Sequence, residues 1–115
     1  MLNHTHYLKF RAVNRDTFEA VKNGAKKVET RAAIKKFRDI KLGDKVKLIC
    51  GKDKFEKEVK KSQIYRTITA MLRKYKPSEI NPKCSTGKEL REMYYSFPGY
   101  RQKIKKYGLI AVELK

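Results

Sequence analysis

Apolar and polar residues alternate in several short segments of the chain, which is the pattern of strands that bury one face. In residues 6–13, for example, Leu8, Phe10 and Ala12 share one face. The end of the chain differs, because Gly-Leu-Ile-Ala-Val-Glu-Leu is nearly all apolar and therefore predicts a strand in the middle of a sheet. The strands predicted in this way are residues 6–13, 26–33, 45–50, 53–61 and 108–114.

Apolar residues at helical spacing mark segments between these strands. A short helix with Phe18 and Val21 follows a cap at Asn14 or Asp16 and ends at the Asn-Gly pair before residue 25. A second helix is predicted over residues 68–75, where Pro77 ends it, and a third follows the capping sequence of residues 85–89. Basic residues 101–106 predict a last helical turn.

The element order β-α-β-β-β-α-α-β predicts an α+β fold, a small mixed β-barrel of about five strands with helical covers. The length of 115 residues fits one domain, residues 1–115. Gly43 and Asp44 form a turn between strands. Residues 53–61 carry many outward Lys and Glu side chains, which favours an exposed or edge strand.

The charge of the chain narrows the class of partner. Thirty Lys and Arg residues against twelve Asp and Glu give a formal net charge of +18. Such a charge favours nucleic acid over an acidic protein or a membrane surface. The sequence contains no apolar run of membrane-spanning length and begins without an apolar stretch, so we expect a cytoplasmic protein with no membrane partner.

Cofactors and metals find little support in the sequence. Cys50 and Cys84 are far apart and are expected to be reduced thiols, while His4 and His6 lack an evident third ligand. No glycine-rich phosphate loop and no serine triad pattern is present. We therefore predict no cofactor and no metal.

The most informative string is Gly-x-Lys-x-x-Glu-x-Arg over residues 24–31. Glu29 and Arg31 share one strand face with Lys27, and Lys26 joins them only if it precedes the regular strand or lies at a bulge. A carboxylate between cations stays ionised and could accept a hydrogen bond from a base amino group. It could also polarise a water while Lys26 or Arg31 stabilises an oxyanion. The alternative is a surface ion pair of about 0–1 kcal/mol.

This string, together with the turn sequence of residues 39–46, resembles the ASCH domains of the PUA-like superfamily. The similarity covers nearly the whole chain and is greatest to the small stand-alone ASCH proteins of bacteria and archaea. It implies a PUA-like barrel whose cleft holds the motif Lys, Glu and Arg, and it implies RNA binding or RNA-linked regulation. Some ASCH proteins are amidohydrolases that deacetylate 4-acetylcytidine, and at least one has been described as a ribonuclease.

The resemblance also assigns roles, and one of them is altered in this chain. The catalytic Lys of the amidohydrolases corresponds to Lys26, but their Thr nucleophile corresponds to Glu29. Their third catalytic group, a Glu, has its nearest counterpart in Glu79. If the chain is an enzyme, the candidate catalytic residues are therefore Lys26, Glu29 and Arg31.

The primary hypothesis is an RNA-binding domain that holds RNA or a modified nucleoside in a basic cleft. Deacetylation of 4-acetylcytidine is the alternative, and RNA cleavage ranks last. Basic residues after the motif strand and those of residues 101–106 are expected to flank the cleft, and Tyr95 and Tyr100 lie off the apolar helical stripe, where they could stack a base. The predicted nucleic-acid-binding residues are Lys26, Lys27, Arg31, Lys35, Lys36, Arg38, Tyr95 and Arg101.

Overall fold

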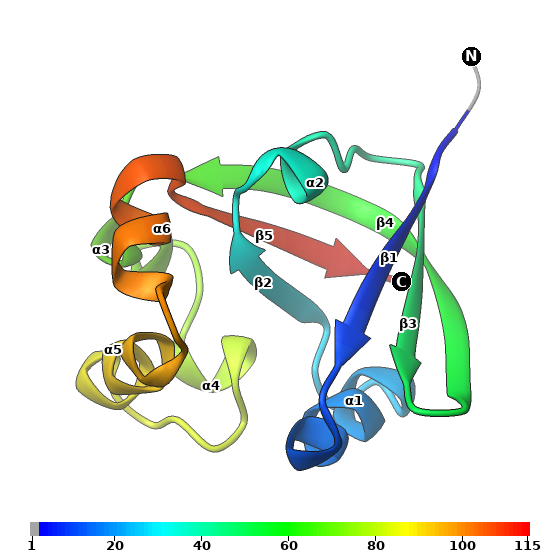
Figure 1. Cartoon of the computed structure of the whole chain (residues 1–115), viewed down its shortest axis with the longest axis horizontal. Coiled ribbons are helices and arrows are strands. Elements are labelled where there is room, and N and C mark those ends of the chain that lie inside the picture. Colours follow the sequence, from blue (N-terminus) through cyan, green and yellow to red (C-terminus); the bar gives the residue numbers. More distant parts are fainter. Residues whose placement is uncertain (1–2) are drawn as a thin grey trace.

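Residues 3–115 are described by a computed structural model, in which a curled sheet forms a half-barrel (Figure 1). The strand order is β1-β3-β4-β5-β2, so β1 and β2 are the two edges of the sheet. β1 pairs with β3 in parallel, and the other neighbours are antiparallel. The strands are β1 (Thr5–Phe10), β2 (Val28–Ala32), β3 (Lys45–Cys50), β4 (Asp53–Tyr65) and β5 (Leu109–Leu114).

Helices cover two sides of this sheet. α1 lies at one end of the half-barrel, and α3 to α6 gather into a layer on the left of Figure 1. The helices are α1 (Arg15–Lys22), α2 (Lys35–Arg38), α3 (Ile68–Leu72), α4 (Pro77–Ile80), α5 (Gly87–Ser96) and α6 (Tyr100–Tyr107), with a 3-10 turn, η1 (Ala12–Asn14), before α1. The predicted α+β fold, a small mixed β-barrel of about five strands with helical covers, is therefore confirmed, and the barrel takes the form of a curled half-barrel.

β4 joins the two halves of the curled sheet. Its first residues pair with β3 and its last residues pair with β5, and the register shifts between Val59 and Lys61. A bulge of this kind increases the local bend and twist of a strand. The thirteen residues of β4 can therefore serve two neighbours that diverge, which produces the curl.

Two hydrophobic clusters lie on opposite faces of the sheet and share β5. Ile110, Val112 and Leu114 belong to the inner cluster, where α1 contributes Phe18 and Val21. The alternating positions of β5 belong to the outer cluster beneath α3 to α6. Burial on both faces explains why this strand reads as an unbroken apolar run, and β5 does lie between two other strands, as predicted.

Several predicted boundaries need correction. β1 ends at Phe10, and Ala12 is exposed in the 3-10 turn instead of buried in the strand. The strand that begins at residue 53 is central, not an edge, and its many charges point to solvent from a part of the sheet that the helices leave uncovered. Pro77 begins α4 at its first turn, where its missing N–H is tolerated, although it was expected only to end a helix.

The Gly43–Asp44 turn ties β1 to β3. Gly43 adopts a φ of 89°, a conformation that favours glycine. The buried Asp44 carboxylate accepts hydrogen bonds from the backbone N–H groups of His4 (3.1 Å) and Lys41 (3.0 Å) and contacts His6 Nε2 at 2.8 Å. These contacts hold the start of β1 beside the start of β3, where their parallel pairing begins.

Candidate functional site

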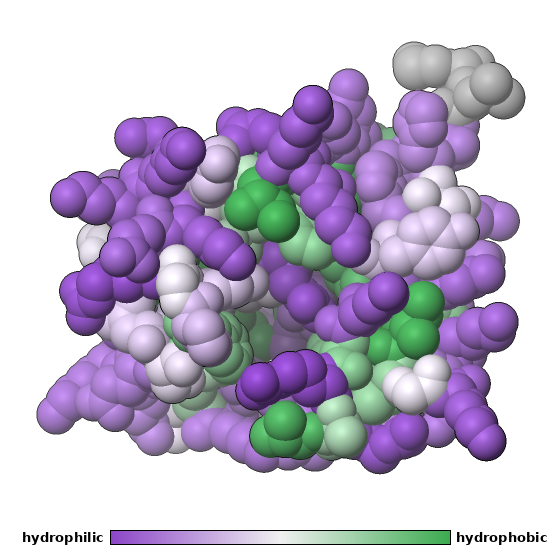
Figure 2. All heavy atoms as spheres, viewed as in Figure 1, coloured by the Kyte–Doolittle hydropathy of each residue, from purple (hydrophilic) through white to green (hydrophobic). Residues whose placement is uncertain are grey.

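A pocket of about 460 Å³ opens where the two edge strands approach each other beneath the helical layer. Figure 2 shows the corresponding hollow near the centre of this face, bordered by both hydrophilic and hydrophobic side chains. The end of β1, the start of β2 and parts of α4 to α6 form its walls. The motif residues Lys26, Glu29 and Arg31 line it together with Thr30.

Lys26 reaches the pocket because it precedes the regular strand. It is only 3% exposed, its backbone N–H donates to Ala20 O at 2.9 Å, and its ammonium donates to Val28 O. Its Nζ lies 3.6 Å from Glu29 Oε2. Burial lowers the pKa of Lys26, although the neighbouring Glu29 carboxylate works in the opposite direction. Burial thus brings this lysine closer to proton exchange near neutral pH.

Glu29 is also buried, at 6% exposure, and its two carboxylate oxygens have different surroundings. Oε1 accepts a hydrogen bond from the Thr30 N–H at 3.1 Å and lies 3.9 Å from Arg31 Nε. Oε2 has no hydrogen-bond donor among residues 3–115. Because buried polar atoms are nearly always paired, this oxygen is the strongest sign of a missing partner in the pocket. The ion pair between Glu29 and Arg31 that the sequence suggested is present, but its carboxylate is buried and not at the surface.

The cluster also covers the free edge of β2. Residue 27 bonds to β5 through its C=O and residue 33 through its N–H, so Val28, Thr30 and Ala32 turn their backbone groups outwards. Side chains meet three of these groups. Lys26 donates to Val28 O, Glu29 accepts from Thr30 N–H, and the Tyr100 hydroxyl accepts from Ala32 N–H at 3.3 Å. The motif thus takes the place of a neighbouring strand.

Arg31 of β2 bridges the two edge strands, β1 and β2. Its Nη1 donates to Lys9 O in β1 at 3.2 Å, and its guanidinium lies 4.8 Å from the Phe10 ring centroid. Glu29 and Arg31 stand opposite Val112 and Ile110 of β5, so both point towards the inner face of the half-barrel. Glu29 and Arg31 therefore line the pocket on the side that adjoins the inner hydrophobic cluster.

Aromatic residues of the helical layer form the opposite wall. Tyr94 is buried and its hydroxyl hydrogen-bonds the Thr30 hydroxyl. Burial raises the pKa of Tyr94 above its usual range. The Tyr94 and Tyr100 rings are stacked, with centroids 6.3 Å apart and planes 7° from parallel, and Phe97 adds an apolar surface. A flat ligand would meet ring faces here and polar atoms on β2.

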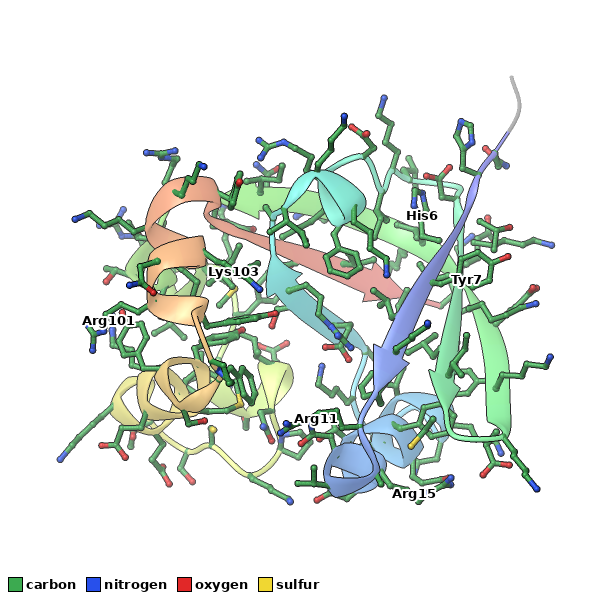
Figure 3. All side chains as sticks on the ribbon, in the orientation of Figure 1. His6, Tyr7, Arg11, Arg15, Arg101 and Lys103 are labelled. Atoms are coloured by element: carbon green, nitrogen blue, oxygen red, sulfur yellow. The ribbon has the colours of Figure 1, made fainter. Side chains whose placement is uncertain are left out.

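The cations at the pocket rim differ from those predicted. Lys9, Arg11 and Lys83 line the pocket, and Figure 3 shows Arg11 beside the opening at the start of α1. Lys83 forms an ion pair with Asp16 of α1, which joins the loop between α4 and α5 to the opposite wall. No sequence pattern marked these three residues, because only the approach of β1, β2 and that loop brings them together.

Some predicted site residues lie elsewhere. Lys35, Lys36 and Arg38 belong to α2, outside the pocket lining, and Arg38 donates to Ala33 O at 2.9 Å. Lys27 is exposed and points away from the pocket, because the strand becomes regular only at residue 28. Lys35, Lys36 and Arg38, which were expected to flank the cleft, do not line it.

Tyr95, Arg101 and Glu79 are also outside the pocket. Tyr95 and Arg101 line a separate groove, and Figure 3 shows Arg101 pointing away from the sheet. Glu79 caps the start of α4 by accepting from Lys76 N–H at 2.8 Å, which leaves it unavailable as a third catalytic group. Tyr100, the other stacking candidate, lines the pocket, as does the buried Tyr94 of the outer cluster.

The comparisons with known proteins establish the fold and leave the function open. No family model and no curated protein matches the sequence. The crystal structure of hypothetical protein PH0355 is 28% identical, with a TM-score of 0.79 over 99% of this chain and 98% of that chain. The solution NMR structure of protein PF0455 from Pyrococcus furiosus is also 28% identical, with a TM-score of 0.73 over 96% of each chain.

The described residues also bear on a metal site, on a membrane-spanning helix and on the two cysteines. Within residues 3–115, no three His, Cys, Asp or Glu side chains are placed to hold a metal ion. Among the helices of that same stretch, none has the length and apolar character needed to cross a bilayer. Cys50 and Cys84 are buried in different hydrophobic clusters and form no disulfide with each other.

Proposed function

We propose that the chain is an ASCH-type RNA-binding domain that holds a base of RNA, or a modified nucleoside, in the pocket between β1 and β2. The observation that carries the proposal is the buried Glu29 Oε2, which lacks a hydrogen-bond donor within the described residues and belongs to a side chain that lines the pocket beside Lys26. Leaving such an oxygen unpaired costs about 1–3 kcal/mol, and a ligand N–H would remove that penalty.

The shape and chemistry of the pocket support a planar ligand that carries a phosphate or sugar outside. Its volume of about 460 Å³ lies within the range of small-ligand sites. Phe97 and Tyr100 provide ring surfaces for a base, with the buried Tyr94 behind Tyr100, while the Glu29 carboxylate and the Lys26 ammonium provide one acceptor and one donor. Lys9, Arg11 and Lys83 at the rim attract an anionic backbone.

Titration calorimetry with uncharged nucleosides tests the pocket without interference from the backbone. Cytidine and 4-acetylcytidine serve as probes, and the variants are Glu29→Gln and, as a control with the same loss of charge, the exposed Glu56→Gln. We expect wild-type protein and Glu56→Gln to bind one of the probes. Glu29→Gln should weaken that affinity at least tenfold, which corresponds to about 1.4 kcal/mol. Equal affinities in all three proteins would contradict the assignment of Glu29.

Amide hydrolysis is the second candidate function. The geometry that favours it is the buried pair of Lys26 and Glu29, with 3.6 Å between Nζ and Oε2. In this mechanism a water attacks the acyl carbon of 4-acetylcytidine and Glu29 accepts the water proton. Lys26 stabilises the oxyanion and then donates a proton to the leaving amine, so that cytidine and acetate are released. Glu29 thus acts as a base where the ASCH amidohydrolases place a Thr.

The two functions are separated by following cytidine release from 4-acetylcytidine by chromatography. An amidohydrolase would release cytidine, and both Lys26→Ala and Glu29→Ala would abolish the release. Folded wild-type protein that binds the nucleoside but releases nothing would leave the pocket as a recognition site. Release that survives Lys26→Ala would contradict this mechanism. RNA cleavage, the third possibility, finds no histidine among the residues that line the pocket.

A further inference from the structure

A second concave surface lies on the other side of the helical layer. It has a volume of about 370 Å³ and is formed by the end of β4, α3, α5 and α6. Tyr95 and Arg101 line it, whereas Tyr94 and Tyr100, their neighbours in sequence, line the pocket. Successive helical residues point about 100° apart, so α5 and α6 present one side to each site. We name this surface the helical groove.

The charge of the helical groove is uniformly positive. Its lining contains four cations and, within residues 3–115, no Asp or Glu. The pocket, in contrast, contains the Glu29 carboxylate. Uncompensated cations that share one concave surface attract anions and release bound counterions when they are neutralised. The four cations are Arg66, Arg91, Arg101 and Lys105.

Two of these arginines are held in place by neighbouring side chains. Arg91 Nη2 donates to Thr69 Oγ1 at 2.7 Å, and Arg101 Cζ lies 4.0 Å from the Tyr95 ring centroid. An arginine placed over an aromatic ring is a platform on which a nucleic-acid base can stack. Tyr95 itself is 38% exposed, so part of its ring remains accessible beside the guanidinium.

We propose that the helical groove is a second RNA-binding site, in which Arg66, Arg91 and Lys105 contact the phosphates of a single strand while Tyr95 and Arg101 stack one of its bases. The proposal extends the proposed function, because the strand whose base enters the pocket would have a separate surface for its backbone. Phosphate contacts carry affinity and salt dependence, whereas the pocket supplies discrimination among bases.

The test compares two variants that lose the same charge. Arg101→Gln/Lys105→Gln alters the helical groove, and Lys52→Gln/Lys54→Gln alters the exposed hairpin between β3 and β4. Binding of a fluorescein-labelled single-stranded RNA of twelve nucleotides is followed by anisotropy at several salt concentrations. We expect the groove variant to bind about tenfold more weakly, because it loses the stacking arginine and one phosphate contact. Its slope of log affinity on log salt should be shallower by about 0.7, the value for the single phosphate contact of Lys105. The hairpin variant should change much less.

Stacking is tested separately with Tyr95→Phe and Tyr95→Ala. Tyr95→Phe should bind the RNA like the wild type, while Tyr95→Ala should lose three- to tenfold in affinity. Inorganic polyphosphate of equal length is the competitor that lacks bases, and it should compete less well than unlabelled RNA. Equal competition, or equal weakening by the groove and hairpin variants, would overturn the proposal and leave only general charge attraction.

Failure of the groove and failure of the pocket give different results. Calorimetry with an uncharged nucleoside reports the pocket alone, and the groove variant should bind the nucleoside like the wild type. If the nucleoside binds but wild-type protein shows no affinity for the RNA, the groove is wrong while the pocket stands. If Arg101→Gln/Lys105→Gln weakens RNA binding and no nucleoside binds, the groove stands and the pocket assignment fails.

Discussion

Lys26 and Glu29 show how one position changes the meaning of a sequence pattern. The alternation of residues 26–33 places Lys26 on the opposite face from Glu29, but the regular strand begins only at residue 28. Lys26 can therefore turn back to the free edge of β2 and approach Glu29 to 3.6 Å. The sequence could show that Lys26 would join Glu29 only if it preceded the regular strand. Whether it does so depends on the hydrogen bond from the Lys26 backbone N–H to Ala20 O, which no local pattern predicts.

At the residue scale, we predict an unusual pH dependence of stability for Lys26→Met. The pKa of Lys26 is lowered by burial, so between that lowered value and 10.5 the unfolded chain binds more protons than the folded chain. The contribution of Lys26 to stability therefore increases as pH rises and is lost as pH falls through the folded-state pKa. Relative to Lys26→Met, wild-type protein should gain stability towards pH 10, by at most about 1.4 kcal/mol per pH unit.

Urea unfolding of the two proteins between pH 7 and 10 measures this difference. The exposed neighbour Lys27 provides the control, because Lys27→Met should unfold in parallel with the wild type over the whole range. Parallel curves for Lys26→Met as well would mean that the Lys26 ammonium is hydrated in the folded protein.

Gly108 gives a second prediction at this scale. It joins α6 to β5 with a φ of 79°, and a Cβ there would lie 2.4 Å from Tyr65 O. Gly108→Ala should destabilise the fold by more than about 2 kcal/mol, since backbone strain adds to a clash that only the backbone can relieve. Gly51→Ala is the matched control, because its φ is also positive but no atom lies within 4 Å of the added Cβ. Equal losses in chemical denaturation would show that the strand accommodates the methyl group.

Among the elements, the strands were easier to predict than the helices. Both strand signals are local: alternation located the first four strands, and the unbroken apolar run located β5 and its central position. Residues 53–61 were predicted as an exposed or edge strand, and the first alternative is confirmed whereas the second is wrong. Outward charges report exposure of a face, not the absence of a neighbouring strand. The segment between β4 and β5 divides into four helices because Pro77 begins one helix and Gly99 precedes another. The sequence pattern predicted three of these helices and missed α4.

The turn before β3 yields a prediction at the element scale. Burial alone would raise the pKa of Asp44, but the hydrogen bond with His6 and those from two backbone N–H groups outweigh it, so the pKa is lowered from 3.8. The stability that Asp44 supplies is therefore present above pH 3.8 and is lost as pH falls through the lower folded-state value. Asp44→Asn should be about 1.5–3 kcal/mol less stable at pH 6, and this difference should shrink below pH 4.

Thermal unfolding at pH 3 and pH 6 provides the measurement for Asp44. Asp39→Asn, an exposed change in the same connection, controls for the loss of one negative charge. A difference between Asp44→Asn and the wild type that stays constant with pH would contradict the role of the ionised carboxylate.

On the scale of the whole molecule, the net charge of +18 acts on folding and on binding in opposite directions. The charge and the resemblance to ASCH proteins predicted a basic cleft, but they misplaced its rim. The residues of α2 were chosen because they follow the motif in sequence. The cations that line the pocket come from two other segments: Lys9 and Arg11 lie at the end of β1, and Lys83 lies in the loop between α4 and α5. The composition predicts a basic surface, but the position of the pocket on that surface depends on how β1 and β2 approach each other.

We therefore predict opposite effects of salt on stability and on RNA affinity. Raising NaCl from 50 to 500 mM screens repulsion among the cations, so the midpoint of thermal unfolding should rise. Over the same range the affinity for single-stranded RNA should fall linearly on a log–log plot, with a slope of about −0.7 per phosphate contact. Differential scanning fluorimetry and anisotropy measure the two quantities. A midpoint that falls with salt would mean that ion pairs outweigh repulsion in this chain.

The covered edge of β2 has a consequence for the protein in concentrated solution. An uncovered edge strand is a template on which another chain can add a strand, and this route leads to aggregation. Lys26, Glu29 and Tyr100 occupy backbone groups that such a strand would need. The side chains proposed to recognise the ligand therefore also block strand addition at β2. Substitutions that remove them should expose these backbone groups and favour aggregation.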